Sequence, residues 1–395
     1  MKDKTALVLK RFVPAATLTN IDGTVSFSYL PEYLGSDGPA IASSLPKDPN
    51  PRVFNNGASP AYFSGLLPEG RRLNAIAKTL KTSASNDLEL LLALGADAIG
   101  DVQVIDPQAD PYVSSAIELP RDSSSLSFTE LQEQYFGSAA SGLPGFQDKI
   151  SSRMLNAPAR HRGKEFIIKF NSDQAPHSVE NEFFFLTLAN RVGLQTAGFE
   201  LLTDRDGHHA LQLERFDRLV LDGKTTRLAM EDACQVLDLY PSQKYEVEFE
   251  AAATALINLC SAQAVAALTL VKQLAFSYLI GNGDAHAKNF SVLQEPSGEW
   301  RVSPAYDLLC TSYYEDKKLA LSVAGKHSGL SRKDLLGFAE SLGLPHRLTS
   351  KVIDDLLRKL AGFTDELDSG ILPFRRDQNY DATKLLRSRA KAFAG

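Results

Sequence analysis

The sequence predicts an α+β protein with two lobes, an extra N-terminal α/β subdomain and a mainly helical C-terminal lobe. Near the N-terminus, apolar and polar residues alternate as they do in strands. In the middle of the chain a hairpin signal, Asp206-Gly207, separates two strand-like runs. After about residue 230, periodic apolar segments typical of helices dominate. The expected parts are an N-terminal subdomain at 1–137, a small lobe at 138–217 and a large lobe at 218–395.

The composition excludes several classes of protein. The 395 residues are 44% hydrophobic, so the chain can bury a sizeable core. Its 48 acidic residues exceed its 42 basic ones, and the net charge of -6 disfavours autonomous binding to nucleic acid. Cys234, Cys260 and Cys310 have neither zinc-site nor disulfide spacing, which is typical of buried thiols in a reducing cytoplasm.

A membrane location is not expected. In the segment "MKDKTALVLKRF", charged residues interrupt the apolar run before it is long enough to form the apolar part of a secretion signal. Residues 251–281 are strongly apolar, but polar side chains such as Asn258 and Lys272 interrupt them. This stretch therefore predicts a buried helix, and we expect a cytoplasmic protein.

The N-terminal part has the pattern of a small α/β unit. Residues 24–29 alternate in the manner of a half-buried strand. Helical patterns follow at 69–81 and 86–94. Residues 107–128 are rich in Pro, Asp and Ser, which indicates a connection to the next unit.

The middle of the chain predicts a strand, a helix and a hairpin. The strand "EFIIKF" is followed by a helix at 180–193 that is apolar around much of its circumference, so we expect it to be buried. His208 and His209 lie at the turn of the hairpin that comes next. A solvated turn is favoured over a metal site there, because no carboxylate or cysteine spacing supports a site.

The C-terminal half predicts helices at 246–281, 331–342, 347–361 and 381–393. The last of them carries several basic residues. A solvated helix face explains these charges best, with a surface for an anionic partner as the alternative.

The chemistry is concentrated in the loop "GNGDAHAKNFS" at 281–291. Phosphoryl transfer needs a carboxylate near the attacking hydroxyl and oxygen ligands for magnesium. Asp284 and Asn289 are five positions apart, which is the separation of the catalytic Asp and the metal-binding Asn in protein kinases. Asp307, eighteen residues after Asn289, is the natural second magnesium ligand. An isolated "GDAH" more often marks a turn, so the hypothesis depends on the joint arrangement.

The loop residues receive separate roles in this hypothesis. Asp284 accepts or orients the proton of the substrate hydroxyl. Lys288 neutralises charge on the transferred phosphate, and His286 holds the loop by a hydrogen bond. Asn289 and Asp307 hold Mg²⁺.

A site for ATP is expected between the lobes. Lys169 lies among apolar residues on a strand, where an ammonium group needs an anion, and we assign it to the α- and β-phosphates. Glu182 either orients Lys169 or serves as a solvent-facing or capping residue. Backbone groups around Glu214 and Phe216 are assigned to adenine, and Asp217 to the ribose, with an ordinary strand end as the alternative.

A glycine-punctuated stretch, "GSAASGLPGFQDK", is assigned as the flexible cover of the phosphates. The residues of this stretch assigned to nucleotide binding are Gly142, Gly145, Gln147 and Lys149.

With these residues in view, the sequence resembles the HipA family, the kinase toxins of bacterial type II toxin-antitoxin systems. The likeness extends over nearly the whole chain, in separated motifs that follow one another in one order. These motifs are "FSGLLPEGRR" (63–72), "GFQDK" (145–149), "FIIKF" (166–170), "ENEFFFLTLA" (180–189), "LERFDR" (213–218), "EDACQVLDLYPSQKYE" (231–246), "LIGNGDAHAKNFS" (279–291) and "SPAYDLL" (303–309).

The resemblance implies a protein-kinase-like bilobal fold, with the N-terminal subdomain packed on the small lobe and ATP in the cleft. It implies Mg²⁺-dependent phosphorylation of serine or threonine on proteins, with aminoacyl-tRNA synthetases among the targets, so that translation and growth stop. It also implies a helix-turn-helix antitoxin of the HipB type as partner, with DNA contacted only indirectly through that antitoxin.

One feature departs from the family pattern. Members often carry a serine three residues before the glycine of the phosphate-covering loop, and its self-phosphorylation ejects the loop and switches the kinase off. In this chain that position is Gly142, and Ser141 lies one residue earlier. Ser141 is therefore the candidate for autophosphorylation, although it is shifted by one residue from the position of the family serine. Ser151 and Ser152 are weaker alternatives.

Two other functions are compatible with the loop. A small-molecule phosphotransferase of the aminoglycoside-kinase type uses a similar Asp, His and Asn loop, although the N-terminal unit and the segments "LLPEG" and "PSQKYE" argue against it. The other is a catalytically inactive co-repressor that only binds a helix-turn-helix antitoxin. The joint presence of Asp284, Asn289, Asp307 and Lys169 argues against lost catalysis.

Overall fold

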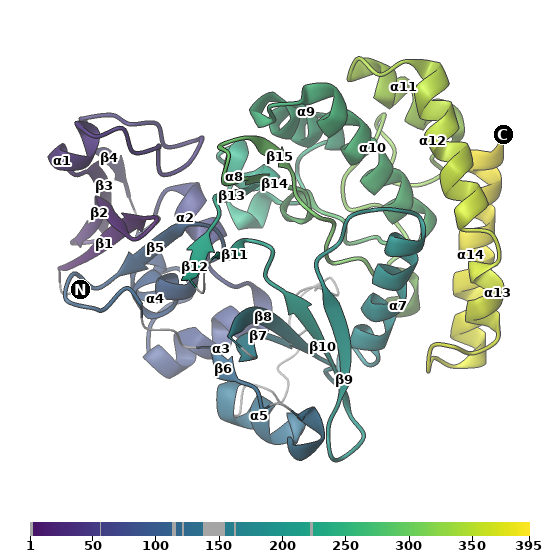
Figure 1. Ribbon diagram of the computed structural model, residues 1–395, viewed down its shortest axis with the longest axis horizontal. Helices are drawn as coiled ribbons and strands as arrows, with labels where there is room; N and C mark the ends of the chain where they lie inside the picture. Colours follow the sequence, from purple (N-terminus) through teal and green to yellow (C-terminus); the bar gives the residue numbers. More distant parts are fainter. Residues whose placement is uncertain are drawn as a thin grey trace.

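The computed structural model describes residues 3–55, 57–112, 116–120, 122–136, 155–161, 163–221 and 224–395. Figure 1 shows an N-terminal sheet on one side of the molecule, a second sheet near the centre and a set of helices on the opposite side. The candidate site lies where these parts meet.

An antiparallel sheet with the strand order β4-β3-β2-β1-β5 forms the N-terminal unit, by which we mean residues 3–105. Its strands are β1 (Lys4–Lys10), β2 (Val13–Ile21), β3 (Thr24–Tyr29), β4 (Arg52–Phe54) and β5 (Val102–Ile105). Its helices are α1 (Pro31–Leu34), α2 (Ala61–Gly65), α3 (Gly70–Leu80) and α4 (Asp87–Leu94). The strand predicted at 24–29 is confirmed, since Val25 and Phe27 are buried while Ser26 is half-buried.

A second sheet has the order β6-β7-β8-β10-β9, in which β6 and β7 run parallel and the other neighbours antiparallel. Its strands are β6 (Ile117–Glu118), β7 (Leu155–His161), β8 (Lys164–Phe170), β9 (Phe199–Thr203) and β10 (His209–Glu214). The pairing of β9 with β10 confirms the hairpin predicted around Asp206-Gly207.

Helix α5 (Phe128–Phe136) packs on this second sheet, because Phe128 is buried and its ring lies 5.7 Å from that of Phe170. Strand β6 and helix α5 therefore belong structurally with the second sheet, although both lie before the boundary proposed at residue 137, and β6 lies in the stretch 107–128 that was predicted to be a connection. The proposed domain limits stay predictions.

Helix α7 (Ser178–Arg191) connects the second sheet to the helical part of the molecule. Val179, Phe185 and Leu188 are buried in an apolar core that this helix shares with the C-terminal helices. The helix predicted at 180–193 is thus confirmed as buried. In Figure 1, α7 lies between the second sheet and the pair α13 and α14, whose bounds are Phe363–Asp368 and Arg376–Ala394.

The remaining C-terminal helices are α8 (Ala233–Val236), α9 (Phe249–Leu259), α10 (Gln263–Leu279), α11 (Arg332–Ser341) and α12 (His346–Lys359). The short strands among them are β11 (Arg218–Leu221), β12 (Lys224–Arg227), β13 (Met230–Asp232), β14 (Ser291–Gln294) and β15 (Trp300–Val302). The continuous helical stretch predicted at 246–281 is interrupted, since α9 ends at Leu259 and α10 begins at Gln263. Within the described part of the chain, none of the helices has the length and apolar character to cross a membrane.

Two basic residues of α14, Arg387 and Arg389, have intramolecular partners. Arg387 pairs with Asp365 at 2.8 Å and with Asp368 at 2.6 Å. Arg389 is buried and donates a 2.7 Å hydrogen bond to the carbonyl oxygen of Tyr278. These contacts favour a structural and solvated role for the helix over a binding surface.

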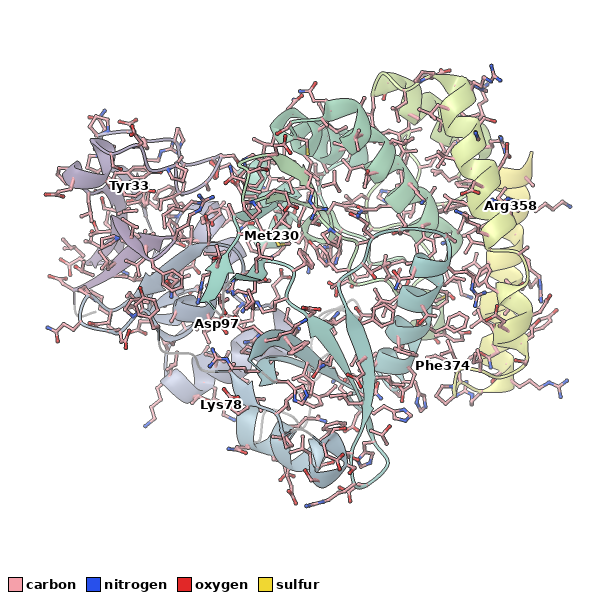
Figure 2. The ribbon with its side chains drawn as sticks, in the orientation of Figure 1. Tyr33, Lys78, Asp97, Met230, Arg358 and Phe374 are labelled. Atoms are coloured by element: carbon pink, nitrogen blue, oxygen red, sulfur yellow. The ribbon has the colours of Figure 1, made fainter. Side chains whose placement is uncertain are left out.

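A buried ion network joins the N-terminal unit to the end of β10. The Asp217 carboxylate accepts hydrogen bonds from Arg215 at 2.9 Å, from Arg218 at 2.7 Å and from the Gly100 backbone N–H at 2.8 Å. Asp97, labelled in Figure 2, pairs with Arg215 at 2.8 Å. Burial alone would raise the pKa of Asp217, but the guanidinium groups of Arg215 and Arg218 hold it below its ordinary value. Because buried charges require partners, this network fixes the N-terminal unit against the second sheet.

Replacing Asp217 by asparagine should destabilise the protein by about 3 kcal/mol or more, because Arg215 and Arg218 lose their shared carboxylate in a buried site. Urea denaturation at neutral pH measures this loss. The matched control is Glu366→Gln, which removes an exposed carboxylate from Arg191 and should cost less than about 1 kcal/mol. Equal losses in the two variants would contradict the prediction.

Candidate active site

The loop that follows α10 is shaped by two glycines. Gly281 has a φ of 79°, in the left-handed region that favours glycine. At Gly283 a Cβ atom would lie 2.6 Å from the carbonyl oxygen of Lys318, which is too close for any side chain. The chain can therefore turn sharply out of α10 and enter the short 3-10 helix at Ala287–Asn289.

Hydrogen bonds tie this loop to Asp307. Asn289 donates from its side-chain amide to Asp307 Oδ2 at 2.9 Å, and its amide oxygen accepts the His286 backbone N–H at 3.1 Å. Asn282 donates to the backbone carbonyl oxygen of Asp307 at 2.9 Å. Asp307 itself has a φ of 52°, a conformation that non-glycine residues seldom adopt and that is frequent at functional sites. The structure thus brings together the two predicted magnesium ligands.

Lys169 forms the centre of a buried charge cluster. Its Nζ lies 2.8 Å from both carboxylate oxygens of Glu182 on α7, and it also pairs with Asp307. Lys169 is 6% exposed and Glu182 is fully buried. The structure therefore places Glu182 at Lys169, and its alternative role as a solvent-facing or capping residue is not observed.

Lys169 and Asp307 are both charged at neutral pH. Burial would lower the pKa of Lys169, but the carboxylates of Asp307 and Glu182 outweigh it and raise that pKa. Burial would raise the pKa of Asp307, but the Lys169 ammonium group holds it below its ordinary value. Burial raises the pKa of Glu182 to about 7 although the Lys169 ammonium group acts to lower it, so Asp307 is the carboxylate of this cluster that stays charged at neutral pH.

The donor set at Asn289 and Asp307 fits Mg²⁺. Both residues carry hard oxygen donors, which this ion prefers, and the 2.9 Å hydrogen bond from the Asn289 amide nitrogen to Asp307 Oδ2 shows that their side chains are adjacent. Phosphate oxygens and water commonly complete such a site.

A cavity of about 340 Å³ adjoins these residues, a volume within the range of small-molecule sites. Its walls come from the second sheet, the C-terminal part and the N-terminal unit. The apolar lining includes Ile99, Ile167, Leu186, Leu213 and Met230, and the polar lining includes Lys169, Asn289 and Asp307. Asp97 and Met230, both labelled in Figure 2, also border the cavity. A pocket that combines apolar walls with charged and polar side chains is suited to a nucleotide.

The residues predicted to bind adenine and ribose also border this cavity. Phe216 lines it, with its ring 5.9 Å from that of Tyr306. Glu214 lines it as well, while its carboxylate accepts a 2.8 Å hydrogen bond from Lys164. Asp217 uses its carboxylate oxygens in the network with Arg215 and Arg218, so its assignment to the ribose stays a prediction.

The predicted catalytic base, Asp284, lies behind the cavity wall. It is 3% exposed and does not border the cavity in the described part of the structure. Its Oδ1 accepts a 2.9 Å hydrogen bond from the hydroxyl of Tyr245. Hydrogen bonds to a catalytic group often become productive only when the substrate is bound, so this position is compatible with the predicted role.

His286 borders the cavity and is buried. Burial lowers its pKa to about 4, so the imidazole is neutral at physiological pH. Its ring meets that of Tyr245 edge-on, with the centroids 5.3 Å apart. Its backbone N–H donates to the Asn289 side chain at 3.1 Å, while a hydrogen bond from the His286 side chain that holds the loop stays a prediction.

Lys288 borders the cavity, but its ammonium group has partners in the N-terminal unit. Its Nζ lies 2.9 Å from Glu69 Oε1 and donates a 3.0 Å hydrogen bond to the carbonyl oxygen of Gly65. The ammonium group already faces a carboxylate, so its contact with a transferred phosphate stays a prediction. Sequence reasoning missed Glu69, Lys244 and Tyr245 as site residues, although they belong to the motifs "LLPEG" and "PSQKYE".

Several predicted residues lie outside the described part of the chain. These are Ser141, Gly142, Gly145, Gln147 and Lys149 of the phosphate-covering stretch, together with Ser151 and Ser152.

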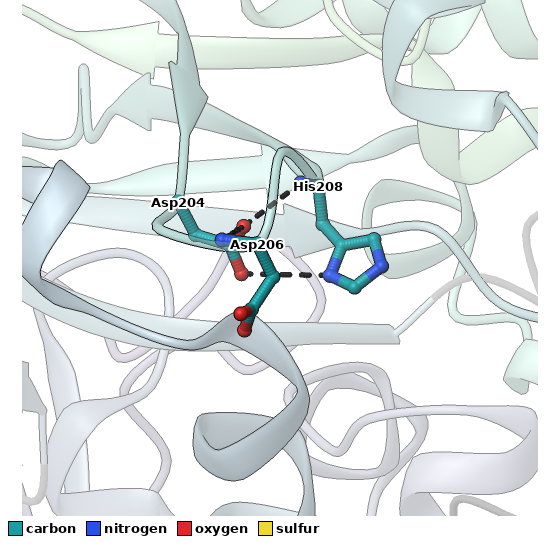
Figure 3. A group of neighbouring side chains, drawn as sticks. All are labelled: Asp204, Asp206 and His208. Carbon is teal, nitrogen blue, oxygen red and sulfur yellow. Dashed lines mark hydrogen bonds and ion pairs between the residues drawn. The ribbon is translucent and has the colours of Figure 1, made fainter.

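The hairpin between β9 and β10 holds a second group of potential metal ligands, Asp204, Asp206 and His208 (Figure 3). Asp204 accepts the backbone N–H groups of Phe128 at 2.7 Å, Asp206 at 2.9 Å and His208 at 2.8 Å. Its carboxylate is therefore used to shape the turn and to anchor α5. Asp206 and His208 are exposed, as expected for a solvated turn.

Two family models match this chain. The family model described as "HipA-like C-terminal domain" matches residues 141–362, and the one described as "HipA N-terminal domain" matches residues 6–105. A putative kinase of Sinorhizobium fredii is 30% identical over 364 residues, which cover 86% of each chain. The serine/threonine-protein kinase toxin HipA of Shewanella oneidensis is 25% identical over 377 residues, covering 85% of this chain and 84% of the toxin.

A solved structure shows the same fold. HipA from the complex of Shewanella oneidensis HipA, HipB and operator DNA superposes with a TM-score of 0.77 at 23% identity, covering 99% of this chain and 97% of that one. The likeness confirms the predicted kinase-like fold with an added N-terminal unit. Together with the two family models, it establishes that this chain belongs to the HipA family.

Proposed function

We propose that this chain is an ATP- and magnesium-dependent protein serine/threonine kinase. The observation that carries the proposal is the meeting of Lys169, Asn289 and Asp307 beside an apolar cavity, with Asp284 on the same loop as Asn289. Each of these residues has a counterpart in the phosphoryl-transfer machinery of protein kinases. The kinase names of the relatives support the same conclusion.

In this proposal Lys169 binds the α- and β-phosphates of ATP while Glu182 keeps its ammonium group oriented. Asp284 accepts the proton of a serine or threonine hydroxyl. The hydroxyl oxygen then bonds to the γ-phosphorus, the bond from that phosphorus to the β–γ bridging oxygen breaks, and ADP leaves. Asn289 and Asp307 hold Mg²⁺, which supplies charge neutralisation for the phosphates when it is bound.

We further propose that the chain is the toxin of a type II toxin-antitoxin system. One relative is named a kinase toxin, and the fold matches HipA from a complex with HipB and operator DNA. A HipB-like helix-turn-helix antitoxin is the proposed partner, and contact with DNA would pass through it. The proposed targets are translation-related proteins such as aminoacyl-tRNA synthetases.

Asp284→Asn should lower phosphoryl transfer at least about 100-fold, because the general base is lost. The measurement is transfer of label from γ-labelled ATP to proteins of a bacterial lysate by the purified chain. Asp206→Asn removes an exposed carboxylate from the distant hairpin and should transfer label like the wild type. Label that persists in Asp284→Asn would disprove the assignment of the base. Phosphorylation of an aminoglycoside, and not of protein, would support the small-molecule phosphotransferase instead.

Asp307→Asn should remove most of the effect of magnesium on ATP binding, because it deletes the anionic ligand and keeps the shape of the side chain. Calorimetry with ATP, with Mg²⁺ or with EDTA, measures this effect. We expect Mg²⁺ to raise the affinity of the wild type for ATP. The factor by which Mg²⁺ raises this affinity should be about 10-fold or more smaller in the variant. Asp377→Asn, which changes an exposed residue, serves as control. A wild type that shows no magnesium-dependent binding would favour the inactive co-repressor.

Expression of the chain alone should slow bacterial growth, and Asp284→Asn should restore it, because toxicity in this proposal requires phosphoryl transfer. Growth curves of matched cultures, with expression checked by immunoblot, provide the measurement. Equal inhibition of growth by the wild type and by Asp284→Asn would show that toxicity does not require phosphoryl transfer, and would contradict the prediction.

A further inference from the structure

Glu69 reaches from the N-terminal unit to the catalytic loop. It lies directly before α3, in a turn where Gly70 has a φ of 58°. Its carboxylate bridges two ammonium groups, since Oε1 lies 2.9 Å from Lys288 and Oε2 pairs with Lys244. Lys288 also donates to the carbonyl oxygen of Gly65 at the end of α2. The turn between α2 and α3 therefore contacts the loop that carries Asp284 and Asn289.

Each lysine that pairs with Glu69 is connected to a different part of the proposed catalytic machinery. Lys288 precedes Asn289 in the chain. The backbone carbonyl of Lys244 accepts the Ala287 N–H at 3.1 Å, and the next residue, Tyr245, donates to Asp284 Oδ1 at 2.9 Å. The Lys244 ammonium also lies 5.1 Å from the centre of the Tyr245 ring. A short series of contacts thus leads from Glu69 to the base and to a metal ligand.

Electrostatics explain why the bridge is stable. The side chains of Lys244 and Lys288 are only 9% and 13% exposed, so their ammonium groups require an anion close by. Burial would raise the pKa of Glu69, but the two lysines lower it to about 2, and the carboxylate is charged at neutral pH. Without Glu69, the two ammonium groups would lose the carboxylate that pairs with both, and Lys288 would keep Asp232 as a nearby anionic group.

We propose that Glu69 is a positioning residue for phosphoryl transfer, which holds the catalytic loop in place through Lys288 and aligns Asp284 through Lys244 and Tyr245. The N-terminal unit then belongs to the catalytic apparatus of this protein, besides forming one wall of the cavity. The consequence for catalysis rests on the proposed kinase function, whereas the ordering of the loop does not.

Hydrogen exchange tests the ordering of the loop without nucleotide or activity. In Glu69→Gln, the backbone amides of residues 282–289 should exchange about 10-fold or more faster than in the wild type, because the loop opens locally more often. Glu89→Gln is the matched control, since it removes another carboxylate of the N-terminal unit from its lysine partner, Lys4, and should leave this segment unchanged. Unchanged exchange in Glu69→Gln, or the same acceleration in both variants, would overturn the proposal.

Steady-state kinetics test the catalytic consequence. We expect kcat to fall about 10-fold or more in Glu69→Gln while KM for ATP changes less than about 2-fold, because the nucleotide contacts are retained and the alignment of the base is lost. A higher KM at unchanged kcat would overturn the positioning role, and so would a rise in kcat, which would make the bridge inhibitory.

A double-mutant cycle with Lys244→Met separates the bridge from general destabilisation. If both residues act through one bridge, the loss of kcat in Glu69→Gln combined with Lys244→Met should be no larger than in Glu69→Gln alone. This combination also removes one of the two unpaired ammonium groups, so it remains informative if the single variant folds poorly. If the fold-loss of kcat in the double variant equals the product of the fold-losses in the two single variants, the two residues act independently and the proposal is contradicted.

Discussion

The burial of the Lys169 ammonium group is the constraint on which the candidate site depends. A cation on a nearly inaccessible strand position is stable only with anionic partners. Here the partners come from α7, through Glu182, and from the segment after β15, through Asp307. Satisfying one charge therefore brings together three segments that are far apart in the sequence. The same contacts place Asp307 beside Asn289, so the arrangement that stabilises the fold also assembles the oxygen ligands of the site.

Paired buried charges also join the N-terminal unit to the rest of the molecule. Asp217 is held by Arg215 and Arg218 at one end of the cavity, where Gly100 and Asp97 contribute from the N-terminal unit. Glu69 contacts Lys244 and Lys288 at another. Ion pairs of this kind add little net stability compared with apolar packing, but a wrong arrangement would leave charges unpaired. They are therefore suited to fixing how the N-terminal unit is oriented on the kinase-like part.

Elements with strong local patterns were predicted well from the sequence. The strand at 24–29, the hairpin around Asp206-Gly207 and the buried helix α7 depend on periodicity and turn chemistry within a few residues. The interruption between α9 and α10 was missed, because the apolar composition of residues 251–281 continues through it. Residues 107–128 were predicted to be a connection, but this stretch contains β6 and the first residue of α5. Their attachment to the second sheet depends on pairing with β7 and on burial of Phe128, which no local pattern encodes.

The sequence alone determined the chemical groups of the site: the spacing of Asp284 and Asn289, the carboxylate of Asp307 and a lysine on an apolar strand. It also determined the family, through motifs in a fixed order. Only the tertiary structure decided which groups meet. In the folded protein, Lys288 pairs with Glu69, Asp217 pairs with two arginines, and Tyr245 forms a hydrogen bond with Asp284. The physical reason is that ion pairs and side-chain hydrogen bonds act over about 3 Å between residues distant in the chain, so their partners are fixed by packing and not by spacing along the sequence.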